Sequence, residues 1–267
     1  AFGTPRIFYS RINGALAGNG LWTTSNTWSF TSNTGPADTG GQVPSLNDIV
    51  IIGALDSVYL TTNPAAINAS VQRCASLQIE RGSALDIGNN PGCSFNRVLS
   101  LAAGNGNFRL TTLNASGSTF VFPTGDFTDF NQNLGTTELY TTNGIAGTYF
   151  FLPQTTSTYG NLILSPLGGS NIIFGNLSIT IWGDLVTRGQ NADSWVCPTW
   201  NVNYPTAPTV PVAKTITIKG NLDIQSGGLI WYQNGAVAQN FVVYGDVKVA
   251  TLAALYVYTA NANGMIE

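Results

Sequence analysis

Short runs of alternating apolar and polar residues are the main pattern in this sequence. They are rich in Val, Ile, Leu, Tyr and Phe, and Gly, Pro, Asn, Ser and Thr interrupt them every few residues. A period of two predicts strands, because successive side chains of a strand point to opposite faces. Signals for helices are nearly absent, so the chain is predicted to be all-β. Examples of the predicted strands are Asp48–Gly53, Ser57–Thr61, Ser76–Glu80, Ala84–Ile87, Asn107–Thr111 and Ser118–Phe122.

One seven-residue pattern recurs five times in the second half of the chain. It reads aliphatic or Thr, any residue, Gly, Asn or Asp, Leu or Val, any residue, aliphatic or Thr. The copies are TYGNLIL (Thr158–Leu164), IFGNLSI (Ile173–Ile179), IWGDLVT (Ile181–Thr187), IKGNLDI (Ile218–Ile224) and VYGDVKV (Val243–Val249).

The parity of these copies divides their side chains between two faces. The first, third, fifth and seventh residues share one face, which we expect to be buried. The glycine on that face lets another part of the chain approach closely, and the Asn or Asp that follows can hydrogen-bond its own turn. The residues expected inside include Leu177, Ile179, Leu222, Ile224, Val247 and Val249, and the asparagines expected to form a ladder are Asn161, Asn176 and Asn221.

The spacing of the copies predicts how they stack. Their glycines lie at positions 160, 175, 183, 220 and 245, so the separations are 15, 8, 37 and 25 residues. Recurrence of one unit at intervals of about 20–30 residues is typical of β-solenoids. We therefore predict a parallel β-helix or β-solenoid, with a β-sandwich of repeated hairpins as the alternative.

Two segments depart from the repeat and define the predicted domains. Residues 1–47 contain Trp22 and Trp28 and are predicted to form an irregular N-terminal cap with both rings buried, because a first coil otherwise exposes an apolar end. Residues 48–267 are predicted to be the solenoid, interrupted by a loop insertion at 189–213.

The loop insertion holds the best candidates for contact with a ligand or partner. It contains four prolines together with Trp195, Trp200 and Tyr204. Exposed aromatic rings stack on sugar rings and anchor protein interfaces, and long loops often carry function. The alternative is that these rings fold back and shield the body of the solenoid.

Composition narrows the possible functions. Only 9% of the 267 residues are charged, against about 25% in an ordinary soluble domain, and the net charge is −3. Clustered Lys and Arg, which nucleic-acid binding needs, are missing, and no run approaches the ~18 apolar residues of a membrane span. The chain has no histidine, so the commonest general base and metal ligand are absent. These features predict an extracellular protein that is not an enzyme, binds no nucleic acid and does not insert into membranes.

The remaining polar chemistry leaves three questions open. Cys74 and Cys93 could form a disulfide in an oxidising compartment, or remain buried free thiols. Asp126 and Asp129 are predicted to stabilise a turn rather than act as a catalytic pair. No metal site or cofactor is assigned, although loop carboxylates could hold calcium; the candidates are Asp38, Asp48 and Asp56.

Several phrases of the chain resemble very large secreted surface proteins of the Bacteroidota, the group that uses type IX secretion and includes gliding bacteria. They include FYSRINGALAGNGLWTTSNTWSF near the start, VPSLNDIVIIGALDSVYLTT, CASLQIERGSALDIG, FPTGDFTDFNQNLGTTELYTT and YFFLPQTTSTYGNLILSPLGGSNIIFGNLSI. The resemblance covers roughly Ile7 to Val249, and the order of the phrases is more specific than any one of them. Those proteins usually carry an acidic pair before the first strand, and this chain has Asn47-Asp48 there. Any calcium site that the acidic pair forms in those proteins is therefore weakened in this chain.

The resemblance implies a β-helix-like module in a long adhesin or filament at the cell surface. We therefore expect a structural or adhesive role after export by type IX secretion. The expected partners are cell-surface or secretion-machinery proteins, glycans or further copies of the chain. A carbohydrate-binding or carbohydrate-active β-helix is the alternative function.

Overall fold

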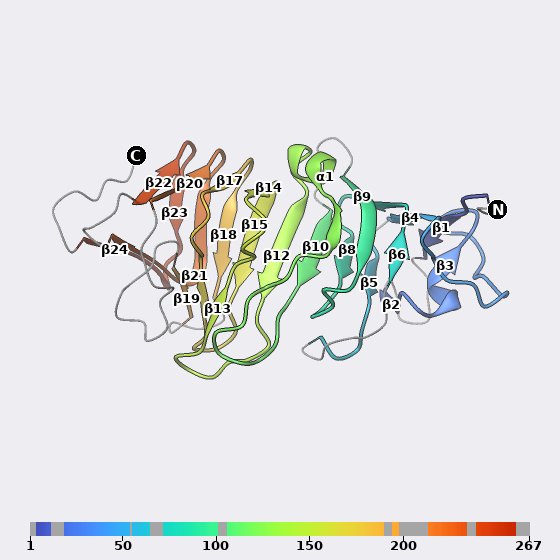
Figure 1. Ribbon diagram of the computed structural model, residues 1–267, viewed down its shortest axis with the longest axis horizontal. Coiled ribbons are helices and arrows are strands. Elements are labelled where there is room, and N and C mark those ends of the chain that lie inside the picture. The colour runs from blue at the N-terminus through green and yellow to red at the C-terminus, as the bar shows by residue number, and fades with distance from the viewer. Residues whose placement is uncertain are drawn as a thin grey trace. The chain divides into compact units, whose positions relative to one another are not determined.

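The computed structural model describes residues 4–11, 19–53, 55–64, 72–100, 106–189, 194–197, 213–233 and 239–259. It is nearly all β, with 45% strand and 4% helix. The chain divides into two compact units (Figure 1): residues 1–111 with 122–137, and residues 112–121 with 138–267. None of the helices in the described ranges has the length and hydropathy that a membrane span requires.

The N-terminal unit consists of short strands with two brief helical segments. In chain order these are β1 (Ile7–Ser10), β2 (Asn19–Leu21), η1 (Ser25–Thr27), β3 (Trp28–Ser29), β4 (Ile49–Ile52), β5 (Ser57–Tyr59), β6 (Arg73–Cys74), β7 (Ser76–Ile79), β8 (Ala84–Asp86), β9 (Ser94–Ser100), β10 (Asn107–Leu110), β11 (Thr124–Asp126) and α1 (Thr128–Gln132). Strand β12 (Thr136–Tyr140) lies where the chain passes from this unit to the next.

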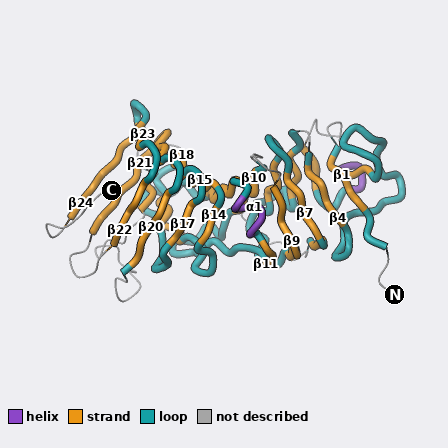
Figure 2. Tube along the Cα trace, turned by 90° about the horizontal axis from the view of Figure 1, so that it is seen from above, coloured by secondary structure: helices purple, strands orange, loops and turns teal. Residues whose placement is uncertain are grey.

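Parallel pairing builds this unit one coil at a time. Strand β4 pairs with β1 and β7, and β7 pairs with β9. Strand β5 pairs with β2 and β8, and β8 pairs with β10. A shorter set joins β6 and β11 to β9. Each passage of the chain thus adds one strand to each set, and Figure 2 shows β4, β7 and β9 side by side. This is the arrangement of a parallel β-solenoid rather than of an antiparallel sandwich.

Two tryptophans near the start of this unit are buried, as predicted. Strand β3 runs antiparallel to β1, and Trp22 and Trp28 are almost fully buried. Their ring centroids lie 5.2 Å apart, and the Trp28 indole N–H donates to the Trp22 carbonyl at 2.8 Å. The ring of Phe95 follows at 6.1 Å from Trp22, and Phe108 follows at 6.2 Å from Phe95. Burial of these large rings supplies much of the apolar area that stabilises the unit.

The predicted boundary after residue 47 does not coincide with a boundary between the units. Strands β1 and β2, which lie in the segment predicted to be a cap, already pair in parallel with β4 and β5. The first coil therefore starts at Ile7. The long segment between β2 and β4 conceals this pairing in the sequence, because the spacing of the later coils is shorter.

The C-terminal unit also consists of short strands, with one long bent strand. They are β13 (Tyr149–Phe151), β14 (Thr158–Tyr159), β15 (Asn161–Ser165), β16 (Asn171–Ile173), β17 (Ile179–Ile181), β18 (Leu185–Arg188), β19 (Trp195–Cys197), β20 (Lys214–Ile218), β21 (Leu222–Gln233), β22 (Gln239–Val243), β23 (Val247–Val249) and β24 (Ala253–Thr259).

Three parallel sheets make the three faces of these coils. One contains β13, β16, β19, the second half of β21, and β24. The second contains β14, β17, β20 and β22, which Figure 2 shows in succession. The third contains β15, β18, the first half of β21, and β23. Strand β21 passes from the third face to the first at Gly227, whose φ of 69° is a conformation that favours glycine.

The inward face of the repeats is largely as predicted. Ile179, Leu222 and Ile224 are at most 2% exposed, and β20 alternates between buried and half-buried residues along its length. The prediction is wrong for Val247 and Val249, which are 44% and 45% exposed. Both lie on β23, which pairs with β21, and the structure describes no strand on the other side of β23. Leu177 is only half-buried, because it falls between β16 and β17 rather than in a strand.

The inward assignment makes a testable prediction. Leu222→Ala should lower the free energy of unfolding by about 2–5 kcal/mol, because the buried side chain leaves a cavity. Asp223→Ala, on the outward face, should cost less than about 0.5 kcal/mol. Val247→Ala, in register with Leu222 but exposed, should cost less than about 1 kcal/mol. Urea titrations measure all three, and equal losses for Leu222→Ala and Val247→Ala would contradict the assignment.

Candidate binding surfaces

Four of the five Gly-Asn/Asp motifs, all but the copy at Gly175, lie at one corner of the C-terminal unit, between its second and third sheets. Backbone hydrogen bonds continue around this corner from coil to coil. The amide of Gly183 donates to the carbonyl of Gly160 at 2.8 Å, Gly220 donates to Gly183 at 2.9 Å, and Gly245 donates to Gly220 at 2.9 Å. The parallel ladder therefore continues through the turn, and the corner is as regular as the strands that it joins.

The side chains after these glycines form a second ladder. The Asn161 Oδ1 atom accepts from the Asp184 amide at 2.9 Å, and Asp184 Oδ1 accepts from the Asn221 amide at 2.7 Å. Asn221 Oδ1 in turn accepts from the Asp246 amide at 2.9 Å. Each coil thus satisfies a backbone N–H of the next coil, which stabilises a group that would otherwise be unpaired at a turn.

The predicted ladder was correct for Asn161 and Asn221 and wrong for Asn176. Asp184 occupies the position in the ladder that was predicted for Asn176. Asn176 lies at another corner, between β16 and β17. The reason is that the second and third copies of the motif belong to successive corners of one coil. Their glycines are only eight residues apart, too close for one full turn of these coils.

The motif glycine is required because the neighbouring side chain occupies its Cβ space. A Cβ atom on Gly183 would overlap the Asn161 Oδ1 atom, and a Cβ on Gly220 would overlap Asp184 Oδ1. At Gly220 the added atom would also lie 2.7 Å from the Gly183 backbone, and at Gly245 it would lie 2.6 Å from the Gly220 carbonyl oxygen. Glycine and Asn or Asp therefore recur together, because each side chain needs the vacant position of the next coil.

An exposed row of side chains precedes these glycines. Trp182, Lys219 and Tyr244 each follow one of three paired residues, Ile181, Ile218 and Val243, and so occupy equivalent places on successive coils. Trp182 is 48% exposed and Tyr244 is 67% exposed. The Lys219 Nζ atom lies 4.5 Å from the centre of the Tyr244 ring, a cation–π contact. We call these three residues the corner row. Sequence analysis did not identify them, although all three occupy the second position of the repeated motif.

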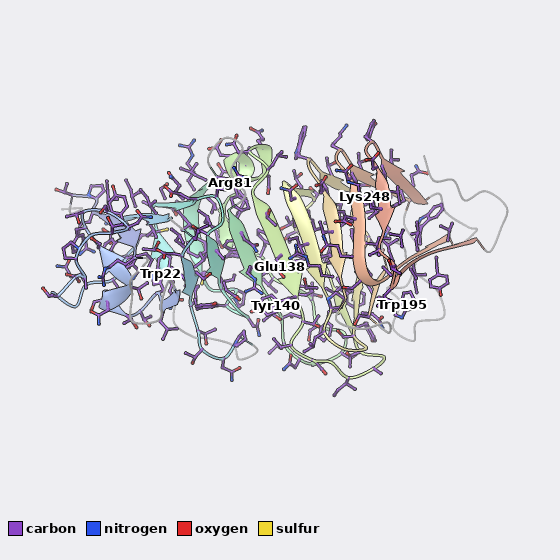
Figure 3. The ribbon with its side chains drawn as sticks, turned by 180° about the vertical axis from the view of Figure 1, so that it is seen from behind. Trp22, Arg81, Glu138, Tyr140, Trp195 and Lys248 are labelled. Atoms are coloured by element: carbon purple, nitrogen blue, oxygen red, sulfur yellow. The ribbon has the colours of Figure 1, made fainter. Side chains whose placement is uncertain are left out.

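Trp195 was predicted to lie in a loop, but it lies in strand β19. It pairs with Asn171 and Gly228 of the neighbouring strands, and its half-buried ring lies 5.3 Å from the Tyr256 ring. Figure 3 shows Trp195 beside these C-terminal strands. A Cβ atom on Gly228 would overlap the ring, so this glycine makes room for it. The other two candidates, Trp200 and Tyr204, lie outside the described residues.

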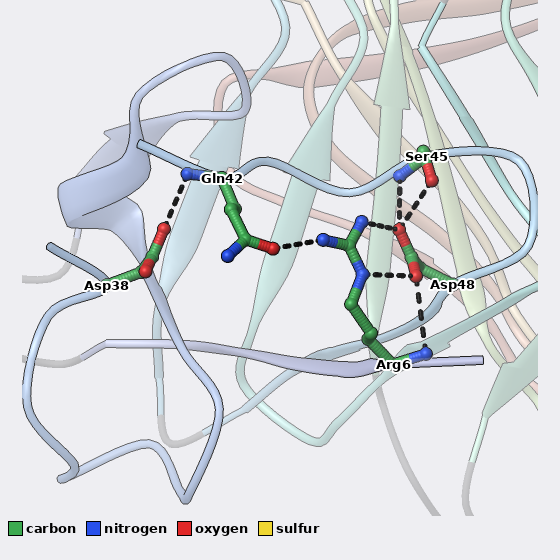
Figure 4. A network of polar contacts seen from close by, with 5 residues as sticks. All are labelled: Arg6, Asp38, Gln42, Ser45 and Asp48. Carbon is green, nitrogen blue, oxygen red and sulfur yellow. Dashed lines mark hydrogen bonds and ion pairs between the residues drawn. The ribbon is translucent and has the colours of Figure 1, made fainter. Parts of the chain in front are cut away.

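The calcium candidates are engaged with protein groups and are not gathered at one place. Asp48 accepts hydrogen bonds from the Arg6 side chain, at 3.0 and 2.7 Å, and from the Ser45 amide and hydroxyl (Figure 4). Burial tends to raise the pKa of Asp48, but these hydrogen bonds outweigh it, and the pKa is lowered. Asp38 accepts from the amides of Gly40 and Gln42.

The third calcium candidate, Asp56, is buried apart from the other two. It accepts a hydrogen bond of 2.5 Å from the Ser10 hydroxyl, and burial raises its pKa. Within the described ranges, His, Cys, Asp and Glu side chains form no group of three or more that could hold a metal ion.

Asp126 and Asp129 have separate local partners. The Asp126 carboxylate accepts from the Thr128 amide at 2.9 Å, which holds the turn before α1, and this lowers its pKa. Asp129 forms an ion pair of 2.5 Å with Arg97 of β9. These contacts give both carboxylates a structural role of the kind predicted for turn residues.

Cys74 and Cys93 are free thiols in this structure, so the disulfide considered above is not formed. Both are buried, and burial raises the pKa of Cys93 to about 12 and that of Cys74 further still. The Cys93 thiol contacts the Gln72 side-chain oxygen at 3.7 Å. A thiol with a raised pKa is a poor nucleophile, because thiolate is the reactive form.

Lys214 is a buried cation near another corner of the C-terminal unit. It is 4% exposed, and its Nζ atom donates to the Gly175 carbonyl at 2.7 Å. Burial lowers its pKa from the ordinary 10.5 to about 8, because the charged form loses its hydration.

A cavity of about 340 Å³ lies on the outer side of the N-terminal unit. Strands β2, β5 and β8 contribute Gly20, Leu21, Tyr59 and Asp86 to its lining. Tyr59 and Asp86 alternate with the buried Val58 and Leu85, so their outward direction follows from the strand period. The parity of the predicted strands could have identified their face, but not their place in the same cavity.

Comparison with known proteins gave no match to a family model, to a curated protein or to a solved structure. The functional argument therefore depends on the residues and their geometry.

The glycine–asparagine contact can be tested by a double-mutant cycle. Gly183→Ala should cost about 1–3 kcal/mol, because the added Cβ overlaps Asn161 Oδ1. In an Asn161→Ala background the same substitution should cost much less, since the obstructing atom is gone. Gly220→Ala in an Asp184→Ala background is the control: there the Gly183 backbone also obstructs, so little relief is expected. Denaturant titrations giving additive losses at Gly183 would contradict the explanation.

Lys214 makes the stability depend on pH in a defined direction. Its folded pKa of about 8 is below the unfolded value, so the unfolded state binds more protons between about pH 8 and 10.5. At pH 7 the buried charge lowers the free energy of unfolding by its full amount, and this destabilisation disappears as the pH rises through this window. The wild type should therefore gain on the order of 2–3 kcal/mol relative to Lys214→Met between pH 7 and 10.5.

The matched control is Lys219→Met, which removes a lysine side chain that is exposed rather than buried. Urea titrations at a series of pH values measure both differences, and subtraction removes the titration of thiols and tyrosines common to all variants. A difference for Lys214→Met that stays constant with pH would refute the buried charge.

Proposed function

We propose that this chain is a structural and adhesive module of an extracellular bacterial surface protein or filament. The observation that carries the proposal is the corner row: Trp182, Lys219 and Tyr244 stand exposed at equivalent places on consecutive coils. Large exposed aromatic side chains are favoured at binding surfaces, because they combine apolar area with few rotatable bonds.

The frame beneath the corner row supports a role in display. Backbone and side-chain ladders join each coil to the next directly below the row, so the backbone of its residues is already ordered before binding. The outward positions elsewhere carry few charges, in keeping with 9% charged residues overall. Such a body contributes rigidity and spacing, while contact is left to particular side chains.

Export by type IX secretion and a place on the cell surface are part of the proposal. They are supported by the resemblance of the phrases between Ile7 and Val249 to secreted Bacteroidota surface proteins. The partners proposed on this basis are glycans, other surface or secretion-machinery proteins, or further copies of the chain.

Adhesion under flow tests the proposal. Beads coated with the purified chain should be retained on glycan-coated or protein-coated surfaces, and the variant Trp182→Ala with Tyr244→Ala should lower retention several-fold, because both exposed rings are lost. The matched control is Ile145→Ala with Leu252→Ala, which removes two other exposed apolar side chains of the same unit. The proposal fails if wild-type beads are retained no better than beads coated with an unrelated protein of similar charge, or if both double variants behave alike.

A further inference from the structure

We propose that the cavity of the N-terminal unit binds one neutral pyranose ring of a glycan. The proposal deepens the adhesive function proposed above, on which it rests, by naming a ligand class and a second contact site. It is carried by the cavity itself, by the row of side chains that forms its floor and by the fixed loop that forms its wall.

The floor is a row of side chains in register on three neighbouring strands. Leu21 of β2 is paired with Tyr59 of β5, and Tyr59 is paired with Asp86 of β8. Neighbouring strands lie about 4.8 Å apart, so the Tyr59 ring has an apolar side chain one strand spacing away on one side and a carboxylate one strand spacing away on the other. A pyranose has an apolar C–H face and a rim of hydroxyl groups, and this floor offers a partner to each.

The wall is a loop held close to the sheet by a glycine. Thr61, Thr62 and Pro64 line the cavity, and the amide of Asn89 donates to the Pro64 carbonyl at 2.8 Å. Gly88 has a φ of 59°, and a Cβ atom there would lie 3.0 Å from the Pro64 Cα atom. The wall is therefore anchored before any ligand arrives, and a preformed cavity loses little entropy on binding.

The charges of the cavity favour a neutral ligand. Asp86 is 7% exposed; its Oδ1 atom accepts from the Gly88 amide at 2.9 Å, and its Oδ2 atom lies 3.2 Å from an Arg109 nitrogen. These contacts fix the carboxylate, whose oxygens each accept more than one hydrogen bond and so can also receive sugar hydroxyls. An acidic sugar would bring a second carboxylate towards Asp86, which is unfavourable.

The dimensions of the cavity agree with a single sugar. A volume of about 340 Å³ is at the lower end of the range of about 300–1,000 Å³ for small-molecule sites. One ring of a longer glycan can enter, while its neighbours continue along the outer face. Affinity for a single ring is accordingly expected to be weak, and many copies of the module would add avidity.

Glycan binding by the full chain tests the proposal. The chain is first applied to an array of neutral and acidic glycans, and methyl pyranosides of the neutral sugars that bind are then titrated by ligand-observed NMR. Tyr59→Ala should weaken binding at least tenfold, because it removes the stacking ring. Tyr59→Phe should bind nearly as well as the wild type, and Asp86→Asn should weaken binding several-fold through loss of the charged acceptor.

The matched control is Tyr9→Ala, which removes a half-buried tyrosine from β1 in the other sheet of the same unit. Urea midpoints verify that each variant is folded. The proposal is overturned if the array shows no neutral glycan, if only acidic glycans bind, or if Tyr59→Ala and Tyr9→Ala bind equally well.

Failure here is distinguishable from failure of the adhesive function. If coated beads adhere through Trp182 and Tyr244 while no methyl pyranoside binds at Tyr59, the cavity proposal fails and the module remains adhesive. If beads adhere to nothing while a methyl pyranoside binds at Tyr59, the adhesive function fails and the sugar site remains.

Discussion

The regularity of the C-terminal unit depends on one steric condition, that each coil leave a vacant Cβ position beneath the Asn or Asp of its neighbour. Gly183 and Gly220 supply that space, and Asn161 and Asp184 use it to bond the next backbone amide. Without the glycine the coils would have to move apart at the corner, and the hydrogen bonds of the adjacent strands would lengthen together. The parallel register of the two faces that meet at this corner is therefore supported by a contact of Gly with Asn or Asp.

Stacking in register also decides what the interior can contain. Residues at equivalent places on successive coils lie directly over one another, as Val58, Leu85 and Phe108 do on one face, and the Phe95 ring of another face packs against Phe108. The same order leaves no hydration for a charge inside, which is why Lys214 has a lowered pKa although its ammonium group reaches the Gly175 carbonyl. One hydrogen bond compensates only part of the hydration that a buried cation loses.

Much of the fold could be predicted from the sequence, because strand parity is a local property. The predicted strand Ser76–Glu80 is observed as Ser76–Ile79, and Leu222 and Ile224 are buried as expected. Ser118–Phe122 is not a strand; of its residues, Thr119 forms an isolated bridge with Phe151. The errors concern which strand or corner lies beside a given residue, because the alternation within one strand carries no information about its neighbours. Val247 has the inward parity of Leu222 but no described coil beyond it, and Asn176 has the motif but lies at another corner.

The candidate sites were harder to predict for the same reason. Tyr59 and Asp86 come together only because β5 and β8 pair in one particular register, and loops of unequal length conceal that register in the sequence. The sequence instead favoured aromatic residues of the long insertion, of which Trp195 belongs to the sheet.

A chain with 9% charged residues and a net charge of −3 cannot attract a partner over long distances. Electrostatic steering needs clustered charge and fades beyond a Debye length of about 8 Å at physiological salt. Recognition of the kind proposed above then acts at contact, through aromatic faces and hydrogen bonds. A solenoid suits such recognition, because register places outward residues that are far apart in the chain into rows. The corner row and the floor of the cavity arise in this way in two separate units, with different residue types on the same kind of frame.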